Sequence, residues 1–314
     1  MKEHRLQQLV EWLKQEDLSG CFLTSTPNVF YISGFYTDPH ERLLGLLAFP
    51  NSEPAIVCPN MEVEQVKKTG WAYGIVGYND TDDPWQKVQE YVKLQGIQVE
   101  KLAVEKEHMT VARLHKLEEI FPGVKLAAAE DKMYQLRLVK DEEEVSILRE
   151  AAKLADFGVE VGVHHLKKGV TEQELVATIE FELKKKGISQ MSFSTMALTG
   201  LKTAAPHGKP GLDKVKEGDL VLFDLGVVLN GYCSDITRTV AFGSVNEQQQ
   251  EIYETVLKAQ LAAVDNCKPG VEIGQIDRTA RSLITERGYG EFFTHRIGHG
   301  LRIEVHEYPA MNGT

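Results

Sequence analysis

The stretch GDLVLFDLGVVLNGYCSDITRTVAFG, residues 218–243, decides the fold of the second half of the chain. Two apolar runs flank Asn230-Gly231, a pair that favours a two-residue type I′ hairpin because both of its positions need positive φ. If the turn is this pair, Asp224 faces Thr237, and Asp235 shares their face of the ribbon. The two aspartates are then diagonal neighbours, about 7–8 Å apart at the backbone. A slip of one residue would place them on opposite faces.

Two carboxylates held side by side in an apolar ribbon need an explanation. At about 6 Å and an effective dielectric of about 20 they repel by roughly 3 kcal/mol. Such a pair persists if it shares a proton, meets cationic side chains or binds a metal ion. The alternative is that Arg238 or backbone amides satisfy one aspartate while the other points to solvent. From the hairpin alone, both interpretations stay open.

Histidines gather near the end of the chain. His295, His299 and His306 fall within twelve residues, and glycines at 298 and 300 flank the middle one. Flanking glycines suggest a place where the backbone approaches a ligand closely, and imidazole is a common ligand of divalent transition metals. The spacing is not that of an HExxH helix. A fourth histidine, His207, lies in a turn-like loop at 204–208 and, taken alone, is an exposed loop residue.

The first third of the chain alternates helical and strand-like patterns, which predicts an α/β domain with a central sheet. The alternation of short helical and strand-like segments ends near residues 131–141, where a long helical pattern begins. We therefore place a domain boundary near residue 130, giving domains 1–130 and 131–314. A capping box at Thr171 and Glu174 begins a helix. The expected helices are 4–16, 61–68, 85–94, 111–120, one from 141, one from 171, 247–265 and 273–287; the expected early strands are 20–24, 43–49, 55–58, 101–105 and 124–126.

Composition limits the classes of function. The chain has 314 residues, of which 42% are hydrophobic, and 35 basic against 46 acidic residues give a net charge of −11. Nucleic acid and anionic membrane surfaces are disfavoured, because both require clustered basic residues. Four scattered cysteines without CxxC pairing, the absence of a signal-peptide pattern and the absence of an apolar run of about 18 residues predict a cytoplasmic protein.

These segments together resemble the pita-bread peptidases: Xaa-Pro dipeptidase (prolidase), aminopeptidase P and, more distantly, methionine aminopeptidase and creatinase. The resemblance rests on Ala204–Gly208, on Asp219–Gly226 continuing through Gly231–Thr239, and on His295–Pro309. It implies an α/β (α+β) fold, with a creatinase-type N-terminal α/β domain followed by a pita-bread catalytic domain that lacks its last strands.

By position, the resemblance implies a role for each candidate residue. Asp224 would bind one metal ion, Asp235 would bridge two, and His299 would bind the second. His306 would help to stabilise the tetrahedral intermediate, while His207 and His295 would line the substrate pocket, His207 in a catalytic role. The expected cofactors are two divalent metal ions, manganese first, with cobalt or zinc as alternatives.

The chain departs from the family pattern in two ways. The family supplies two further glutamate ligands after the segment of His306, and the printed sequence ends at Thr314, before such a segment. We therefore expect incomplete metal binding and little activity from this chain. Arg302 stands where the family usually has glycine, and we expect it to crowd the pocket or to pair with a substrate carboxylate.

The implied function is hydrolysis of the peptide bond before proline in Xaa-Pro dipeptides or short peptides. That bond is a tertiary amide without an N–H, and two metal ions can generate hydroxide and polarise its carbonyl. The alternatives are aminopeptidase P, a creatinase-like metal-free amidinohydrolase and an inactive, truncated binding module. A homodimer is expected by resemblance.

Overall fold

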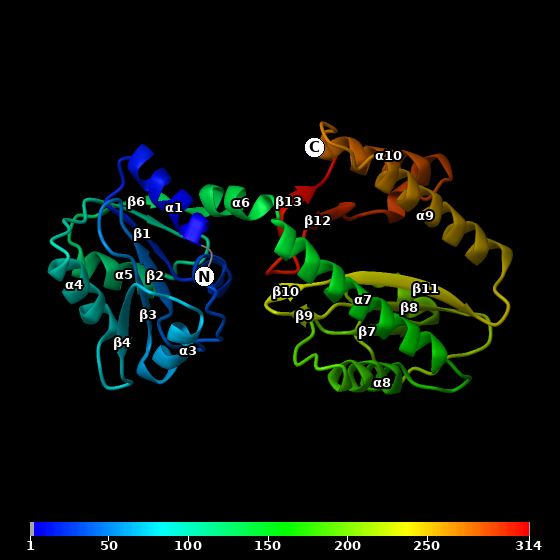
Figure 1. Cartoon of the computed structure of the whole chain (residues 1–314). Coiled ribbons are helices and arrows are strands. Elements are labelled where there is room, and N and C mark those ends of the chain that lie inside the picture. The colour runs from blue at the N-terminus through cyan, green and yellow to red at the C-terminus, as the bar shows by residue number, and fades with distance from the viewer. Residues whose placement is uncertain (1–2, 314) are drawn as a thin grey trace. The chain divides into compact units, whose positions relative to one another are not determined.

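The computed structural model describes residues 3–313 and contains two compact units, Met1–Val139 and Lys140–Thr314 (Figure 1). The division lies nine residues beyond the boundary that the sequence predicts, because helix α6 (Glu130–Leu138) packs within the first unit. Tyr31 donates a hydrogen bond to the carbonyl of Leu136 over 2.6 Å, and the guanidinium of Arg137 donates to Asn28 over 2.8 Å. These bonds make α6 the last element of unit 1.

Unit 1 is built on a six-stranded mixed sheet with the order β4-β3-β2-β1-β5-β6. Strand β2 is antiparallel to both of its neighbours, and the remaining pairs are parallel. The strands are β1 (Gly20–Leu23), β2 (Gly45–Ala48), β3 (Ala55–Pro59), β4 (Gly74–Tyr78), β5 (Lys101–Val104) and β6 (Lys125–Ala128). The helices are α1 (Glu3–Gln15), α2 (Thr26–Ser33), η1 (Asn60–Glu62), α3 (Val63–Lys68), α4 (Pro84–Leu94), α5 (Val111–Ile120) and α6.

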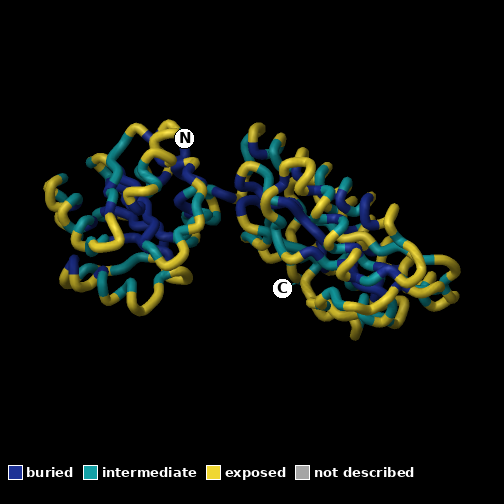
Figure 2. The backbone as a smooth tube through the Cα atoms, turned by 90° about the horizontal axis from the view of Figure 1, so that it is seen from below, coloured by how far each residue is buried: buried dark blue, intermediate teal, exposed yellow. Residues whose placement is uncertain are grey.

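Both faces of this sheet are covered. Every residue of β1, β2 and β3 is buried, as expected for strands between two helical layers, and Figure 2 shows the buried tube at the centre of the unit. Phe22 meets the indole of Trp85 edge-on, with ring centroids 5.9 Å apart, and thereby ties β1 to α4. The predicted α/β domain is confirmed. Strand β4 was not predicted, because two glycines in five residues weaken its strand pattern.

Unit 2 begins with two capped helices that cover one face of a three-stranded antiparallel sheet of order β11-β8-β7. The predicted capping box of Thr171 and Glu174 is confirmed, and Asp141 with Glu144 forms another. Phe223 points at the helix α7, where a Cβ on Gly162 would lie 2.7 Å from its ring. The elements are α7 (Glu142–His164), α8 (Glu172–Lys185), β7 (Met196–Thr199), η2 (Gly200–Ala204), β8 (Asp219–Leu225) and β11 (Ile236–Phe242).

The central hairpin has the predicted register. Asn230 and Gly231 have φ of 50° and 82°, as a type I′ turn requires. Leu229 pairs with Tyr232 beside the turn, and Asp224 pairs with Thr237 farther along the ribbon. Two short strands close the turn, β9 (Val228–Leu229) and β10 (Tyr232–Cys233).

The last part of unit 2 lies on the side of the sheet away from α8 (Figure 1). Helices α9 and α10 share a small apolar core, and β12 pairs with β13. These elements are α9 (Glu247–Asp265), α10 (Ile273–Glu286), η3 (Gly290–Phe292), β12 (Gly298–Gly300) and β13 (Glu307–Met311). Within residues 3–313, every helix is too short or too polar to cross a bilayer.

Candidate active site

The hairpin carries both candidate aspartates. Val221, Phe223 and Leu225 are buried in the core beneath α7 and α8, so the alternate residues of β8, Asp224 among them, face the other way. Thr237, opposite on β11, donates a hydrogen bond to Asp224 Oδ1 over 3.0 Å. Asp235, two residues before Thr237, lines the same cavity as Asp224. The predicted pairing of Asp224 with Thr237 is confirmed, and the role of the two carboxylates stays a prediction.

The electrostatics of this pair follow from its burial. Desolvation raises the pKa of Asp224 to about 6, the nearby charge of Asp235 adds to the rise, and the hydrogen bond from Thr237 opposes it. The guanidinium of Arg238 donates instead to the carbonyl of Thr237 over 2.8 Å. The alternative in which Arg238 satisfies one aspartate is therefore not supported.

His299 completes this side of the site from β12. Its Nε2 lies 3.5 Å from Asp235 Oδ2, and its Nδ1 lies 3.0 Å from the carbonyl oxygen of Gly300. A carbonyl only accepts hydrogen bonds, so Nδ1 carries the proton in the neutral ring and Nε2 holds a lone pair. A lone pair facing a carboxylate needs a proton or a cation between them. Without a bound metal ion, a proton on Nε2 takes this position. The hydrogen bond with Asp235 accordingly raises the pKa of His299.

The separation of these two atoms also suits a shared ion. Two atoms that each bind one ion at about 2.1 Å lie about 3–3.4 Å apart, close to the 3.5 Å between Nε2 and Oδ2. Carboxylate oxygen and imidazole nitrogen are donors that manganese, cobalt and zinc accept. Within residues 3–313, however, no three His, Cys, Asp or Glu side chains are already placed to hold an ion. The donor types fit a divalent cation, and the metal centre stays a prediction.

The glycines beside His299 lie close to strand β13. A Cβ on Gly300 would lie 2.3 Å from the carbonyl oxygen of Tyr308, and one on Gly298 would lie 3.3 Å from the sulfur of Met311. The close neighbour of Gly300 is therefore strand β13, which pairs tightly with the strand that carries His299. The prediction that these glycines admit a ligand stays a prediction.

His306 lies directly against His299. The two rings meet edge-to-face with centroids 4.2 Å apart. Burial lowers the pKa of His306, and the neighbouring charges of His299 and Arg296 lower it further. A neutral imidazole beside a candidate ligand can donate one hydrogen bond from its N–H.

All six candidate residues line one cavity of about 1380 Å³. His207 and His295 lie on its wall from two separate loops, so the structure brings together residues that are up to 99 positions apart in sequence. Basic side chains also line it, namely those of Lys209 and Arg296. The cavity lies within unit 2 and has room for a short peptide.

Buried charges that the sequence analysis did not single out hold these loops in place. Glu172, fully buried, accepts hydrogen bonds from Thr199 N, from Gly211 N and from the ammonium of Lys202, and so closes both ends of the loop that carries His207. Arg281, paired with Asp277, donates to the carbonyl of His295 over 2.8 Å. In the sequence, Glu172 is only an acidic residue at the start of a helix. Exposed helix starts show the same pattern, so the pattern does not identify a buried residue that holds a loop.

Arg302 does not occupy the pocket. Its side chain is fully buried, its Nε donates to Glu144 Oε1 over 2.7 Å, and its Nη2 contacts the same oxygen. The expectation that Arg302 crowds the pocket or pairs with a substrate carboxylate is wrong, because the guanidinium is used inside the fold.

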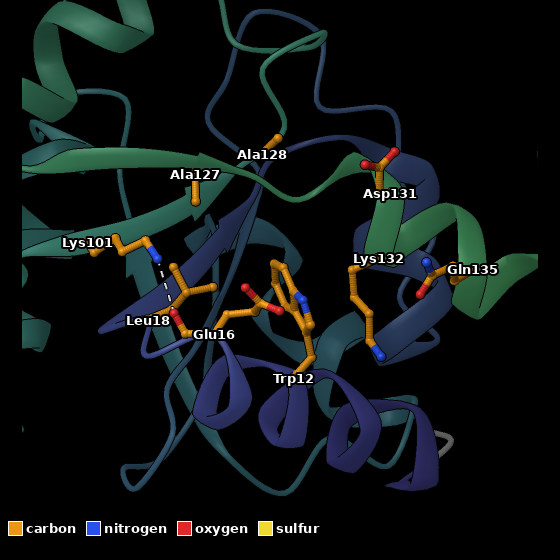
Figure 3. Close-up of a pocket in the computed structure, with 9 residues that line it drawn as sticks. All are labelled: Trp12, Glu16, Leu18, Lys101, Ala127, Ala128, Asp131, Lys132 and Gln135. Atoms are coloured by element: carbon orange, nitrogen blue, oxygen red, sulfur yellow. Dashed lines mark hydrogen bonds between the residues drawn. The ribbon is translucent and has the colours of Figure 1, made fainter.

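Unit 1 has a smaller hollow of about 270 Å³ between α1 and α6 (Figure 3). Trp12 forms one wall, and Lys101 reaches across to the carbonyl of Glu16 over 3.1 Å. Two acidic side chains, Glu16 and Asp131, balance two lysines there, so no net charge selects an ionic substrate. None of the six candidate residues lines this hollow.

Comparison with known proteins gives the same assignment. Residues 146–314 match metallopeptidase family M24, and residues 5–139 match the creatinase/prolidase N-terminal domain. The chain is 51% identical over 309 residues to the "Putative dipeptidase YkvY" of Bacillus subtilis, a match that covers 98% of this chain and 85% of that protein.

The chain belongs to metallopeptidase family M24.

Solved members of the family share its architecture. The Xaa-Pro dipeptidase from Bacillus anthracis superimposes with a TM-score of 0.91 at 32% identity, covering 99% of this chain and 84% of that one. The prolidase from Pyrococcus horikoshii gives 0.89 at 31% identity, covering 99% and 85%. The predicted fold, a creatinase-type N-terminal domain with a pita-bread catalytic domain, and the assignment as a metallopeptidase of the hydrolase class are confirmed.

Proposed function

We propose that this metallopeptidase hydrolyses the peptide bond before proline in Xaa-Pro dipeptides and short peptides, with two divalent metal ions, manganese first, at Asp224, Asp235 and His299. The observation that carries the proposal is the position of His299 Nε2, 3.5 Å from a carboxylate oxygen of Asp235, on the wall of a peptide-sized cavity. The names of the relatives, a dipeptidase and Xaa-Pro dipeptidases, support the substrate class.

The chain's own residues divide the work. Bound metal ions would supply a hydroxide at neutral pH and polarise the scissile carbonyl. His306, packed on His299 and with its pKa lowered by burial, would donate a hydrogen bond to the oxygen that carries negative charge in the tetrahedral intermediate. His207 and His295 would hold the substrate from the cavity wall, on loops fixed by Glu172 and Arg281.

Two assays test the proposal. The chain is incubated with manganese and an Xaa-Pro dipeptide, and release of free proline is measured with and without a chelator. We expect slow, manganese-dependent release, and its loss in the His306→Ala variant; the rate relative to that of the Bacillus anthracis Xaa-Pro dipeptidase measures the low activity expected of this chain. A tripeptide Xaa-Pro-Yaa is the matched substrate: faster cleavage of it identifies an aminopeptidase P.

Other outcomes overturn the proposal. Hydrolysis of creatine without metal would identify the amidinohydrolase alternative, and tight binding of proline peptides without turnover would identify a binding module. The homodimer stays a prediction, and light scattering coupled to size-exclusion chromatography measures it.

A further inference from the structure

A second feature of unit 2 lies behind the candidate site. Glu144, Tyr232 and Arg302, here named the Glu144 cluster, are all buried. One carboxylate oxygen of Glu144 accepts from Arg302 Nε and, over 3.0 Å, from the hydroxyl of Tyr232. Its other oxygen accepts from the backbone N–H of Asp141 at the start of α7 over 2.9 Å.

Two members of the cluster each lie three residues in sequence from a candidate metal ligand. Tyr232 stands three residues before Asp235, and Arg302 stands three residues after His299. The segments that carry these two candidate ligands are thus both fastened to one carboxylate at the beginning of α7, a helix of 23 residues. The cluster therefore connects both segments to one rigid element.

The same two segments also bond directly to each other. The backbone N–H of Cys233 donates to the carbonyl of Arg302 over 2.6 Å, and the thiol of Cys233 donates to the carbonyl of Ile303 over 3.2 Å. Both bonds are buried, and they join residues 69 and 70 positions apart in the sequence. A movement of Arg302 would therefore also move Cys233 on strand β10. It would change the spacing between the segment that carries Asp235 and the segment that carries His299.

We propose that the Glu144 cluster is a positioning device that sets the separation of Asp235 and His299, and through it the affinity of the site for a divalent cation. The proposal rests on the proposed function for the role of those two residues. Its physical basis is that a buried guanidinium keeps a carboxylate partner in one fixed geometry, since leaving either charge unpaired is costly. A metal site tolerates little error, and partners behind the ligands are typically worth 10–100-fold in affinity.

A double variant separates positioning from stability. Glu144→Leu with Arg302→Met replaces the buried pair by apolar side chains, a change that often keeps or raises stability. Because the change also removes the acceptor of the Tyr232 hydroxyl and half of the capping box of α7, we expect a modest fall in melting temperature, while amide exchange over residues 298–303 rises at least tenfold. Manganese affinity, measured by calorimetry, should fall at least tenfold.

Controls keep each outcome decisive. Arg302→Lys keeps the charge but not the planar geometry, and we expect it to fold and to show a smaller change of the same kind. Glu105→Gln removes a carboxylate of unit 1 that is buried and bonded to three donor residues; it should lower stability without changing manganese affinity.

The exchange measurement needs no metal and decides the positioning claim by itself. Wild-type exchange over 298–303 in the folded double variant would overturn the proposal, as would unchanged manganese affinity. A wild-type chain that neither binds manganese nor cleaves any Xaa-Pro peptide would instead overturn the proposed function.

Discussion

Removing the charge of Asp224 should stabilise the metal-free protein while it abolishes metal binding. The pKa of this carboxyl is raised from 3.8 to about 6 by burial and by Asp235. A tenfold change in proton affinity corresponds to about 1.4 kcal/mol, so the ionised group costs at most about 3 kcal/mol at neutral pH. Screening at a partly buried side chain reduces the cost to about 1–2 kcal/mol. Asparagine keeps an oxygen for the hydrogen bond from Thr237 and carries no charge.

The sign of the pH dependence follows from the direction of the shift. Because the folded pKa is the higher one, the unfolded chain binds fewer protons between about pH 4 and pH 6, and wild-type stability falls as pH rises through that window. The Asp224→Asn variant lacks this titration. The gain in stability of this variant over the wild type should therefore be absent near pH 4, reach its full size by pH 6 and stay constant above pH 6. For a unit of this size it corresponds to about 2–8 °C in melting temperature.

The assay must report on unit 2. All three tryptophans, Trp12, Trp71 and Trp85, lie in unit 1, so their fluorescence serves as an internal control, and calorimetry or amide exchange of β8 gives the result. Asp219→Ala on the same strand is the matched variant; it removes the oxygen that accepts from the hydroxyl of Thr199 and from the backbone N–H of Lys216, and it should lower stability. A less stable Asp224→Asn variant at pH 8, or an equal gain at pH 4 and pH 8, would refute the reasoning.

Three further predictions concern other parts of unit 2. Manganese affinity, measured by calorimetry, should fall as pH drops from 7.5 to 5.5, since protons compete at Asp224, with its pKa of about 6, and at His299, whose pKa Asp235 raises; a flat profile would contradict this. Glu172→Gln should weaken the buried bond to Lys202 and free the loop of His207, seen as faster proteolysis within 204–209, and unchanged proteolysis would contradict it. Gly162→Val should lower the free energy of unfolding of unit 2 by about 1–3 kcal/mol, because a Cβ there meets the ring of Phe223 at 2.7 Å; calorimetry with no loss would show that the contact relaxes.

Local patterns in the sequence were sufficient for much of unit 2. The Asn230-Gly231 turn, the alternation of the strands and the capping box at Thr171 depend on neighbours in sequence, and they fixed the register that places Asp224 opposite Thr237. The convergence of histidines on the cavity came from the family resemblance and not from spacing.

Tertiary contacts explain what the sequence did not reveal. Arg302 and Glu144 are 158 positions apart, and nothing local marks either as one half of a buried ion pair. The need for Gly300 is set by the carbonyl of Tyr308 on the neighbouring strand. The division between the two units lies after Val139 and not near residue 130, because the side chains of Tyr31 and Arg137 attach α6 to unit 1.

Binding of divalent cations by Asp224, Asp235 and His299 can be observed directly. Crystals of the 314-residue chain soaked in manganese, measured near the manganese absorption edge, give an anomalous map that locates the ion. We predict one peak about 2–2.5 Å from oxygens of Asp224 and Asp235, and a second peak at the same distance from Asp235 and His299 Nε2. Manganese bound elsewhere, with Asp224 still hydrogen-bonded to Thr237, would show that these residues are not the metal ligands.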